Sequence, residues 1–196
     1  MKPEPSFVLA SASPRRRDLL SQLGLAFLVD PADVDESVHP KEQPDDYVRR
    51  VSSAKAKVVH ARQGGKVVLA ADTSVVVDAE ILGKPDSDVD GKRMLRLLSG
   101  RSHRVVTCVA VLSPGGLRTD LVSTAVEFRR LTHWEIDWYV GTGEGEDKAG
   151  GYASQARAAA FITRMDGSHT NVIGLPLVEA LGLLERGGVE MPWRPR

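Results

Sequence analysis

The sequence has few of the features that mark secreted, membrane or disulfide-bonded proteins. Cys108 is the only cysteine among 196 residues, which excludes an internal disulfide and a thiolate-rich metal site. No apolar run approaches the roughly 20 residues of a membrane-spanning helix. The first five residues lack the apolar stretch of a secretory signal. We therefore expect a cytoplasmic protein that makes no membrane contact.

An excess of charge of one sign is also absent. Lys plus Arg and Asp plus Glu number 26 each, so no overall field attracts nucleic acid. Four Phe, three Trp and three Tyr make ten aromatic residues, and none is interleaved with the basic runs 15–17 and 49–50. An RNA-binding domain that uses these arginines is therefore disfavoured, and no nucleic-acid partner is expected. An anionic ligand would need a local basic cluster.

Apolar runs and turn residues predict alternating strands and helices. Buried strands are expected at 7–10 and at 67–71, the latter ending at Asp72-Thr73, with another strand at 27–29 and hairpins at 78–80 and 113–116. Helices are expected from Pro14 with Ser13 as N-cap, after Pro44-Asp45-Asp46, and at 88–99, 132–140 and 175–184. The pattern indicates one α/β domain over 1–196 with a mixed sheet, and the tail 187–196 is expected to fray.

The segment 11–17, Ser-Ala-Ser-Pro-Arg-Arg-Arg, places three arginines at a predicted helix N-terminus. Positive side chains there oppose the helix dipole, at a cost of a few tenths of a kcal/mol each on the scale of roughly 0.3–1 for terminal charges. A bound phosphate would remove the conflict, because hydroxyls, free N–H groups and guanidinium groups all bind it. A solvated basic turn is the alternative interpretation.

Two further groups of residues suit phosphate chemistry. Asp72 follows an apolar strand, where α/β sheets build sites, and could bind a metal or activate water, while Lys84 could neutralise a phosphate. The acidic loop 33–36 offers oxygen ligands for Mg²⁺ or Mn²⁺. An acidic loop is more often only solvated, and Lys55 on its helix could simply extend to solvent.

The glycine-rich stretch 141–151 resembles a phosphate loop only superficially. It carries Glu144 and Glu146 where a phosphate would lie, so a P-loop or Rossmann role is disfavoured. We interpret the stretch as a functional loop or lid. Gln155, just beyond it, has both a donor and an acceptor with which to read a base edge.

Together these segments resemble the Maf family of nucleotide pyrophosphatases, once described as septum-formation inhibitors. The matching stretches, in family order, are Leu-Ala-Ser-Ala-Ser-Pro-Arg-Arg at 9–16, Ala-Asp-Thr at 71–73, Ile-Leu-Gly-Lys-Pro at 81–85, Asp-Lys-Ala-Gly-Gly-Tyr at 147–152 and Asn-Val-Ile-Gly-Leu-Pro-Leu at 171–177. The resemblance implies an inosine-triphosphatase-like fold, an elongated mixed sheet with flanking helices around a central cleft. It also implies metal-dependent hydrolysis of a nucleoside triphosphate to the monophosphate and pyrophosphate.

The resemblance also implies roles for individual residues. Asp72 would activate water or hold the metal, Glu36 would assist with the metal, and Lys84 would act with them in catalysis. The substrate would be bound by a larger set: Ser11, Ser13, Arg15, Arg16, Lys55, Thr73 and Gln155. A divalent ion, Mg²⁺ or Mn²⁺, would be the cofactor, and a homodimer is plausible.

Three positions divide the family by substrate. Arg15, Thr73 and Gln155 match the dTTP/UTP branch, whereas the branch that prefers 7-methyl-GTP has Trp, Gln and Glu there. The chain departs from the family pattern at Ala54, where Glu is frequent, and at Ala153 and Ala156 around Gln155. The open alternatives are a 7-methyl-GTP pyrophosphatase and a nucleotide-binding regulator of cell division with little turnover.

Overall fold

The computed structural model of the chain describes residues 4–193, which fall into two compact units. The first unit comprises the residues up to Asp72, 107–121 and those from Gly174 onward. The second comprises 73–106 and 122–173. No helix within residues 4–193 has the length and apolar character needed to cross a membrane.

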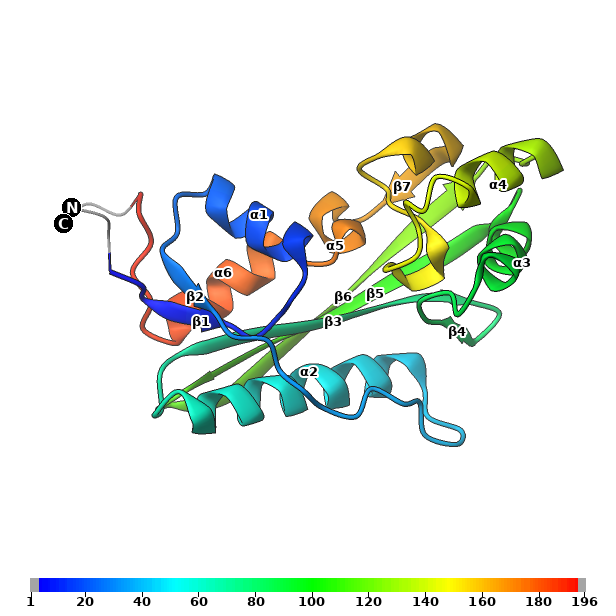
Figure 1. Ribbon diagram of the computed structural model, residues 1–196. Coiled ribbons are helices and arrows are strands. Elements are labelled where there is room, and N and C mark those ends of the chain that lie inside the picture. The colour runs from blue at the N-terminus through cyan, green and yellow to red at the C-terminus, as the bar shows by residue number, and fades with distance from the viewer. Residues whose placement is uncertain (1–3, 194–196) are drawn as a thin grey trace. The chain divides into compact units, whose positions relative to one another are not determined.

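Seven strands within the described residues form one mixed sheet in the order β2-β1-β3-β5-β6-β7, with β4 paired to β3 (Figure 1). Their bounds are β1 Phe7–Leu9, β2 Phe27–Val29, β3 Val68–Val77, β4 Glu80–Leu82, β5 Ser102–Ser113, β6 Gly116–Phe128 and β7 Ile162–Asp166. β1 pairs in parallel with β2 and β3, whereas β3–β4 and β6–β7 are antiparallel. The predicted α/β class with a mixed sheet is confirmed.

In the first unit, the alternation of side chains along β1 and β3 makes two cores. Its helices are α1 Pro14–Gln22, α2 Pro44–Arg62 and α6 Leu177–Arg186. Odd-numbered residues such as Leu9 and Leu69 pack with α1 and α6. Even-numbered residues such as Val8 and Val68 pack with α2 on the opposite face (Figure 1). An even-numbered polar residue of β3 must therefore face α2.

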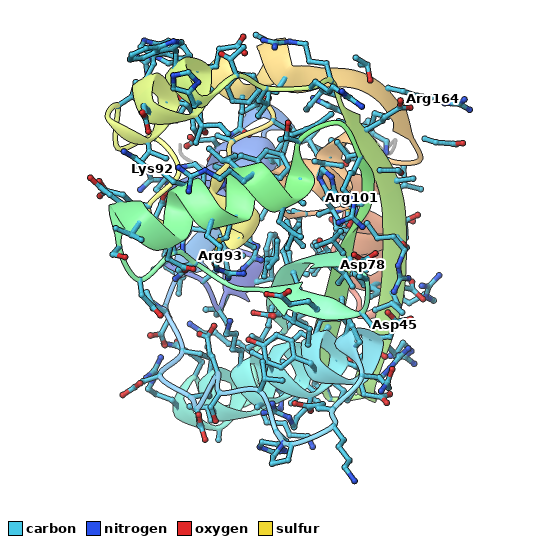
Figure 2. All side chains as sticks on the ribbon, turned by 90° about the vertical axis from the view of Figure 1, so that its right-hand side faces the viewer. Asp45, Asp78, Lys92, Arg93, Arg101 and Arg164 are labelled. Carbon is cyan, nitrogen blue, oxygen red and sulfur yellow. The ribbon has the colours of Figure 1, made fainter. Side chains whose placement is uncertain are left out.

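The second unit has its own core, formed by strand segments, α3 and α4 with aromatic rings at its centre. Its helices are α3 Asp88–Leu98, α4 His133–Val140 and α5 His169–Ile173, with short 3-10 turns at Ala149–Gly151 and Arg157–Phe161. Lys92 and Arg93 project from α3 (Figure 2), and Lys92 Nζ lies 2.8 Å from Asp137 of α4. Asp78, in the β3–β4 turn, pairs with Arg101 at 2.6 Å.

The starts of α1, α3 and α4 agree with the sequence predictions, because their signals are local. α2 begins at Pro44 itself, earlier than predicted, and α6 begins at Leu177 rather than at 175. Ser13 caps α1 by accepting from the Arg16 N–H, and Thr132 forms a capping box with Glu135. The short helix α5 was not predicted, since its five residues carry no apolar period.

Two predictions are wrong. β3 does not end at Asp72-Thr73 but continues to Val77, because 75–77 are β-branched residues that pair with β4. The tail from Gly187 does not fray throughout, since Val189 and Met191 are buried in the core of the first unit. Residues 194–196, also part of that predicted tail, lie outside the described residues.

Candidate active site

Asp72 is a buried carboxylate in the middle of β3. It continues the face of Val68 and Ala70, which packs on α2, and so meets Lys55 of that helix. The Lys55 Nζ donates to Asp72 Oδ1 at 2.8 Å, and both side chains are about nine-tenths buried (10% and 8% exposed). A carboxylate in a strand interior is tolerated here because a buried cation neutralises it.

The prediction that Asp72 lies at the end of its strand is wrong. Asp72 does not lie at the carboxyl end of its own strand, since β3 runs on to Val77. The strand that ends is the parallel neighbour β1, whose last residue, Leu9, pairs with Leu69. The end of β1, rather than that of β3, leaves the backbone near Asp72 without a neighbouring strand on that side.

Glu36 joins the same cation from the acidic loop. Its Oε1 lies 3.0 Å from Lys55 Nζ, so Lys55 bridges Glu36 and Asp72. The Tyr47 hydroxyl of α2 donates to the Glu36 carbonyl at 2.9 Å and holds this part of the loop against the helix. Asp35 instead accepts from the Ser37 N–H at 2.8 Å, and Asp33 is exposed. Of the three acids in the loop, Glu36 is the one that pairs with Lys55.

Burial and charge act on these groups in opposite directions. Burial raises the pKa of Asp72, and the nearby Lys55 and Arg16 oppose that rise. Burial lowers the pKa of Arg16, and the negative charge of Asp72 counteracts it. The pKa of Tyr47 is raised, first by burial and then by the charges of Asp72 and Glu36. The site thus combines three buried charges, those of Arg16, Lys55 and Asp72, with the exposed carboxylate of Glu36.

The first turn of α1 contributes Arg16 to these charges, and the Arg16 side chain is buried, with 9% exposed. Its Nη1 donates to the Ala71 carbonyl at 2.8 Å and to Ser11 Oγ at 3.2 Å, and its Nε donates to the Gly174 carbonyl at 2.8 Å. Ser11 Oγ also accepts from the Ser13 N–H at 3.2 Å. Arg15 is half-buried and Arg17 exposed. Arg16 therefore binds three oxygen atoms of the protein itself.

The second unit carries the other predicted site residues. Thr73 is half-buried in β3, whereas Lys84 and Gln155 are exposed. The Gly150 N–H donates to the Gly83 carbonyl at 2.9 Å, so the glycine-rich loop holds the residue that precedes Lys84. The roles of Thr73, Lys84 and Gln155 stay predictions.

The loop 141–151 is tightly packed within the second unit. Glu144 pairs with Arg157 at 3.0 Å. A Cβ on Gly145 would lie 2.1 Å from the carbonyl oxygen of Gly151, so only glycine allows these two backbone segments to approach. The Tyr139 hydroxyl accepts from the Ala153 N–H at 3.0 Å, which anchors the segment that leads to Gln155.

Sequence reasoning missed the two tyrosines that position these loops. Tyr47 has the spacing of an apolar residue on α2, and Tyr139 that of one on α4. Both are buried, yet their hydroxyls make the contacts described above. A buried Tyr needs a partner for its hydroxyl, which is the one signal that the sequence offers; the identity of the partner depends on tertiary contacts.

A divalent metal ion needs several oxygen or nitrogen ligands that converge on one point. Within residues 4–193, no three His, Cys, Asp or Glu side chains converge around a point that could hold an ion. Asp72 and Glu36 do converge on one cation, the ammonium of Lys55. Mg²⁺ at nucleotide sites is commonly bound by one or two carboxylates with substrate phosphates completing its shell. These two residues therefore fit such an ion when nucleotide supplies the remaining oxygens.

Comparison with known proteins identifies the family. The family model described as Maf-like protein matches residues 6–187. The chain belongs to the Maf family. A protein of Anaeromyxobacter dehalogenans (strain 2CP-C) described as dTTP/UTP pyrophosphatase is 55% identical over 193 residues, 96% of this chain and 97% of that protein. A protein of Myxococcus xanthus (strain DK1622) with the same description is 49% identical, with 95% of each chain covered.

A similarity to a solved structure was also found. The structure of the Staphylococcus aureus Ham1 protein matches with a TM-score of 0.47 and 17% sequence identity, covering 92% of this chain and 96% of that one.

Proposed function

We propose that this Maf protein hydrolyses dTTP and UTP to the nucleoside monophosphate and pyrophosphate. The observation that carries the proposal is the bridge Asp72–Lys55–Glu36, in a chain whose relatives described as dTTP/UTP pyrophosphatases align over nearly their whole length. A buried carboxylate beside a cation that can pair with phosphate is suited to hydrolysis of a phosphoric anhydride.

The chemistry assigned to Asp72 is that of a general base. Its burial raises the pKa of the carboxyl above the ordinary range, which makes the carboxylate a better proton acceptor. Asp72 accepts a proton as a water oxygen attacks the α-phosphorus in line with the bridging oxygen. The bond from the α-phosphorus to that oxygen breaks, and pyrophosphate leaves.

Positive groups balance the charge of the substrate. The triphosphate carries roughly four negative charges, and most of the catalysis comes from positioning and charge neutralisation. Ser11, Ser13, Arg15 and Lys55 are proposed to bind phosphate from the first unit, and Lys84 is proposed to neutralise phosphate charge. Asp72 and Glu36 would hold Mg²⁺ or Mn²⁺, which when bound lowers the pKa of water and neutralises phosphate charge.

Thr73 and Gln155, with Arg15, are assigned to recognition of the base. A side-chain amide can donate to O4 of uracil or thymine and accept from N3–H, which matches the exposed Gln155. The 7-methyl-GTP branch of the family, with Glu at this position, is the second candidate. The proposal includes a cytoplasmic location, where nucleoside triphosphates are made and used, and allows for a homodimer.

A pyrophosphate-release assay tests the proposal. The purified protein receives dTTP, UTP, CTP, 7-methyl-GTP or ITP, with Mg²⁺, with Mn²⁺ or with EDTA. We expect metal-dependent release from dTTP and UTP, with little from the other three. Preference for 7-methyl-GTP would contradict the base assignment but keep the reaction. Binding without release from any of the five would favour a nucleotide-binding regulator.

A further inference from the structure

The buried guanidinium of Arg16 makes hydrogen bonds within the protein that a role in phosphate binding does not explain. Arg16 is the third residue of α1, a position where a side chain can reach a bound anion. Two of its three nitrogens, Nε and Nη1, instead donate to protein oxygens at 2.8–3.2 Å. These acceptors come from three separate segments: Ser11 just after β1, Ala71 in β3, and Gly174, the residue that follows α5.

The contact with Ala71 has a particular place in the sheet. In the parallel pair β1–β3, the Val8 N–H donates to the Val67 carbonyl and the Ala10 N–H to the Leu69 carbonyl. Continued at the same two-residue spacing, the next acceptor is the Ala71 carbonyl. The β1 strand has already ended at Leu9, and the Ala71 carbonyl accepts from Arg16 Nη1 instead.

We propose that Arg16 is a positioning residue, whose guanidinium supplies the hydrogen bond of the β-ladder that the end of β1 leaves out. This bond fixes the peptide carbonyl directly before Asp72, and therefore the direction in which Asp72 faces Lys55. The inference rests on the proposed function of Asp72 and changes the predicted role of Arg16 from phosphate ligand to support of the catalytic strand.

The shape of the guanidinium explains why arginine is needed. Its planar group places Nε toward the Gly174 carbonyl and Nη1 toward the Ala71 carbonyl, so that one side chain ties both to Ser11. A lysine ammonium keeps the charge but donates from a single point, and so cannot span the same acceptors. The substitution Arg16→Lys therefore keeps the positive charge while removing the set of hydrogen bonds, which separates the two effects.

Steady-state kinetics on dTTP compares the neighbouring arginines. Because a displaced catalytic group costs about 10²-fold in rate, Arg16→Lys is expected to lower kcat by about that factor. The KM for dTTP should stay within about threefold, because ground-state binding is unchanged. Arg15→Gln should mainly raise KM, and Arg17→Lys, at an exposed position, should match the wild type. A KM raised about tenfold by Arg16→Lys with kcat unchanged would overturn the proposal.

If Arg16→Lys does not fold, an NMR measurement on the wild-type protein tests whether Arg16 is hydrogen-bonded within the protein. The Arg16 Nε–H resonance should be protected from solvent exchange in the nucleotide-free protein, and inorganic pyrophosphate should leave its chemical shift unchanged. Rapid exchange that slows only when pyrophosphate is added would overturn the proposal. This readout does not need turnover, so a wild type that releases no pyrophosphate from dTTP or UTP would count against the proposed function alone.

Discussion

At the scale of single residues, the site pairs buried charges with one another and with the exposed carboxylate of Glu36. Lys55 lies between Asp72 and Glu36, and Arg16 adds a second buried positive charge. An unpaired ion in such a place is costly, so removing one partner of a buried pair is strongly destabilising. These residues are therefore coupled, and a change in one alters the environment of the others.

Replacing Asp72 with Asn is expected to lower kcat by about 10²–10⁴-fold, the range that a general base contributes. The amide keeps the shape and one acceptor for Lys55 but cannot take the proton from water. Nucleotide affinity, measured by calorimetry with a dTTP analogue that has a methylene group between the α- and β-phosphorus atoms, should change only a few-fold. Asp120→Asn, at a half-buried acid that pairs with Arg186, is the matched control. Unchanged turnover in Asp72→Asn would remove Asp72 from its role.

At the scale of elements, the core of the second unit contains a histidine that stays neutral. His103, near the start of β5, packs edge-on against Phe128 and Tyr152, and its Nε2 lies 2.8 Å from the Tyr152 hydroxyl. Burial lowers the pKa of His103 from 6.5 to about 4. The unfolded chain therefore binds a proton near pH 6.5, while the folded protein does not until about pH 4.

This difference predicts that stability falls on acidification. The contribution of His103 is fully present above pH 6.5 and is lost as the pH falls from 6.5 toward 4, by about 3 kcal/mol in all. Urea unfolding at several pH values should show a flatter pH dependence for His103→Phe over this range. Tyr152→Phe should keep the wild-type slope, because burial rather than the hydrogen bond lowers the pKa. Equal slopes for His103→Phe and the wild type would contradict the prediction.

The glycine-rich loop supplies a second test at this scale. Gly150 has φ +70°, and a Cβ there would lie 2.8 Å from Cγ2 of Val75. Gly150→Ala is therefore expected to cost about 1–2 kcal/mol for the left-handed backbone and about 1–3 kcal/mol more for overpacking. Gly64→Ala has a similar φ of +63° and open space around it, so it should show the backbone cost alone. Chemical denaturation measures both; equal losses would show that Val75 accommodates the methyl group.

At the scale of the whole molecule, three strands run through both units. The boundary between the units falls inside β3, β5 and β6, at 72/73, 106/107 and 121/122. Because each strand is continuous, we expect both cores to unfold in one cooperative transition, as the predicted single domain requires.

Calorimetry checks this cooperativity. Leu69→Ala in the first unit and Leu95→Ala in the second, both fully buried, should each cost about 2–5 kcal/mol. Each should also shift the same single transition, with equal calorimetric and van't Hoff enthalpies. Two separate transitions, each sensitive to only one of the substitutions, would show that the units unfold independently.

The sequence predicts features that depend on residues close together in the chain, and it does not predict those that depend on distant residues. The caps at Ser13 and Thr132 and the turn at 78–80 depend on residues within a few positions, and all three agree with the structure. The Maf motifs likewise led to the family, which the comparison confirmed. The role of Arg16 depends on contacts with distant segments, which no local pattern contains. The continuation of β3 past Asp72 was missed because the polar residues 72–74 interrupt the apolar run of the strand.

The hydrogen bond from Arg16 to Ala71 also differs from the neighbouring hydrogen bonds of the ladder in how easily a mutation can remove it. The bonds at Val67 and Leu69 are made by peptide groups, which every amino acid other than proline provides, so most mutations leave them in place. The one next to Asp72 is made by a side chain, and one missense mutation is enough to delete it. The catalytic strand is thus most vulnerable to genetic change where it carries its acid, and selection should tolerate lysine at position 16 less readily than at position 17.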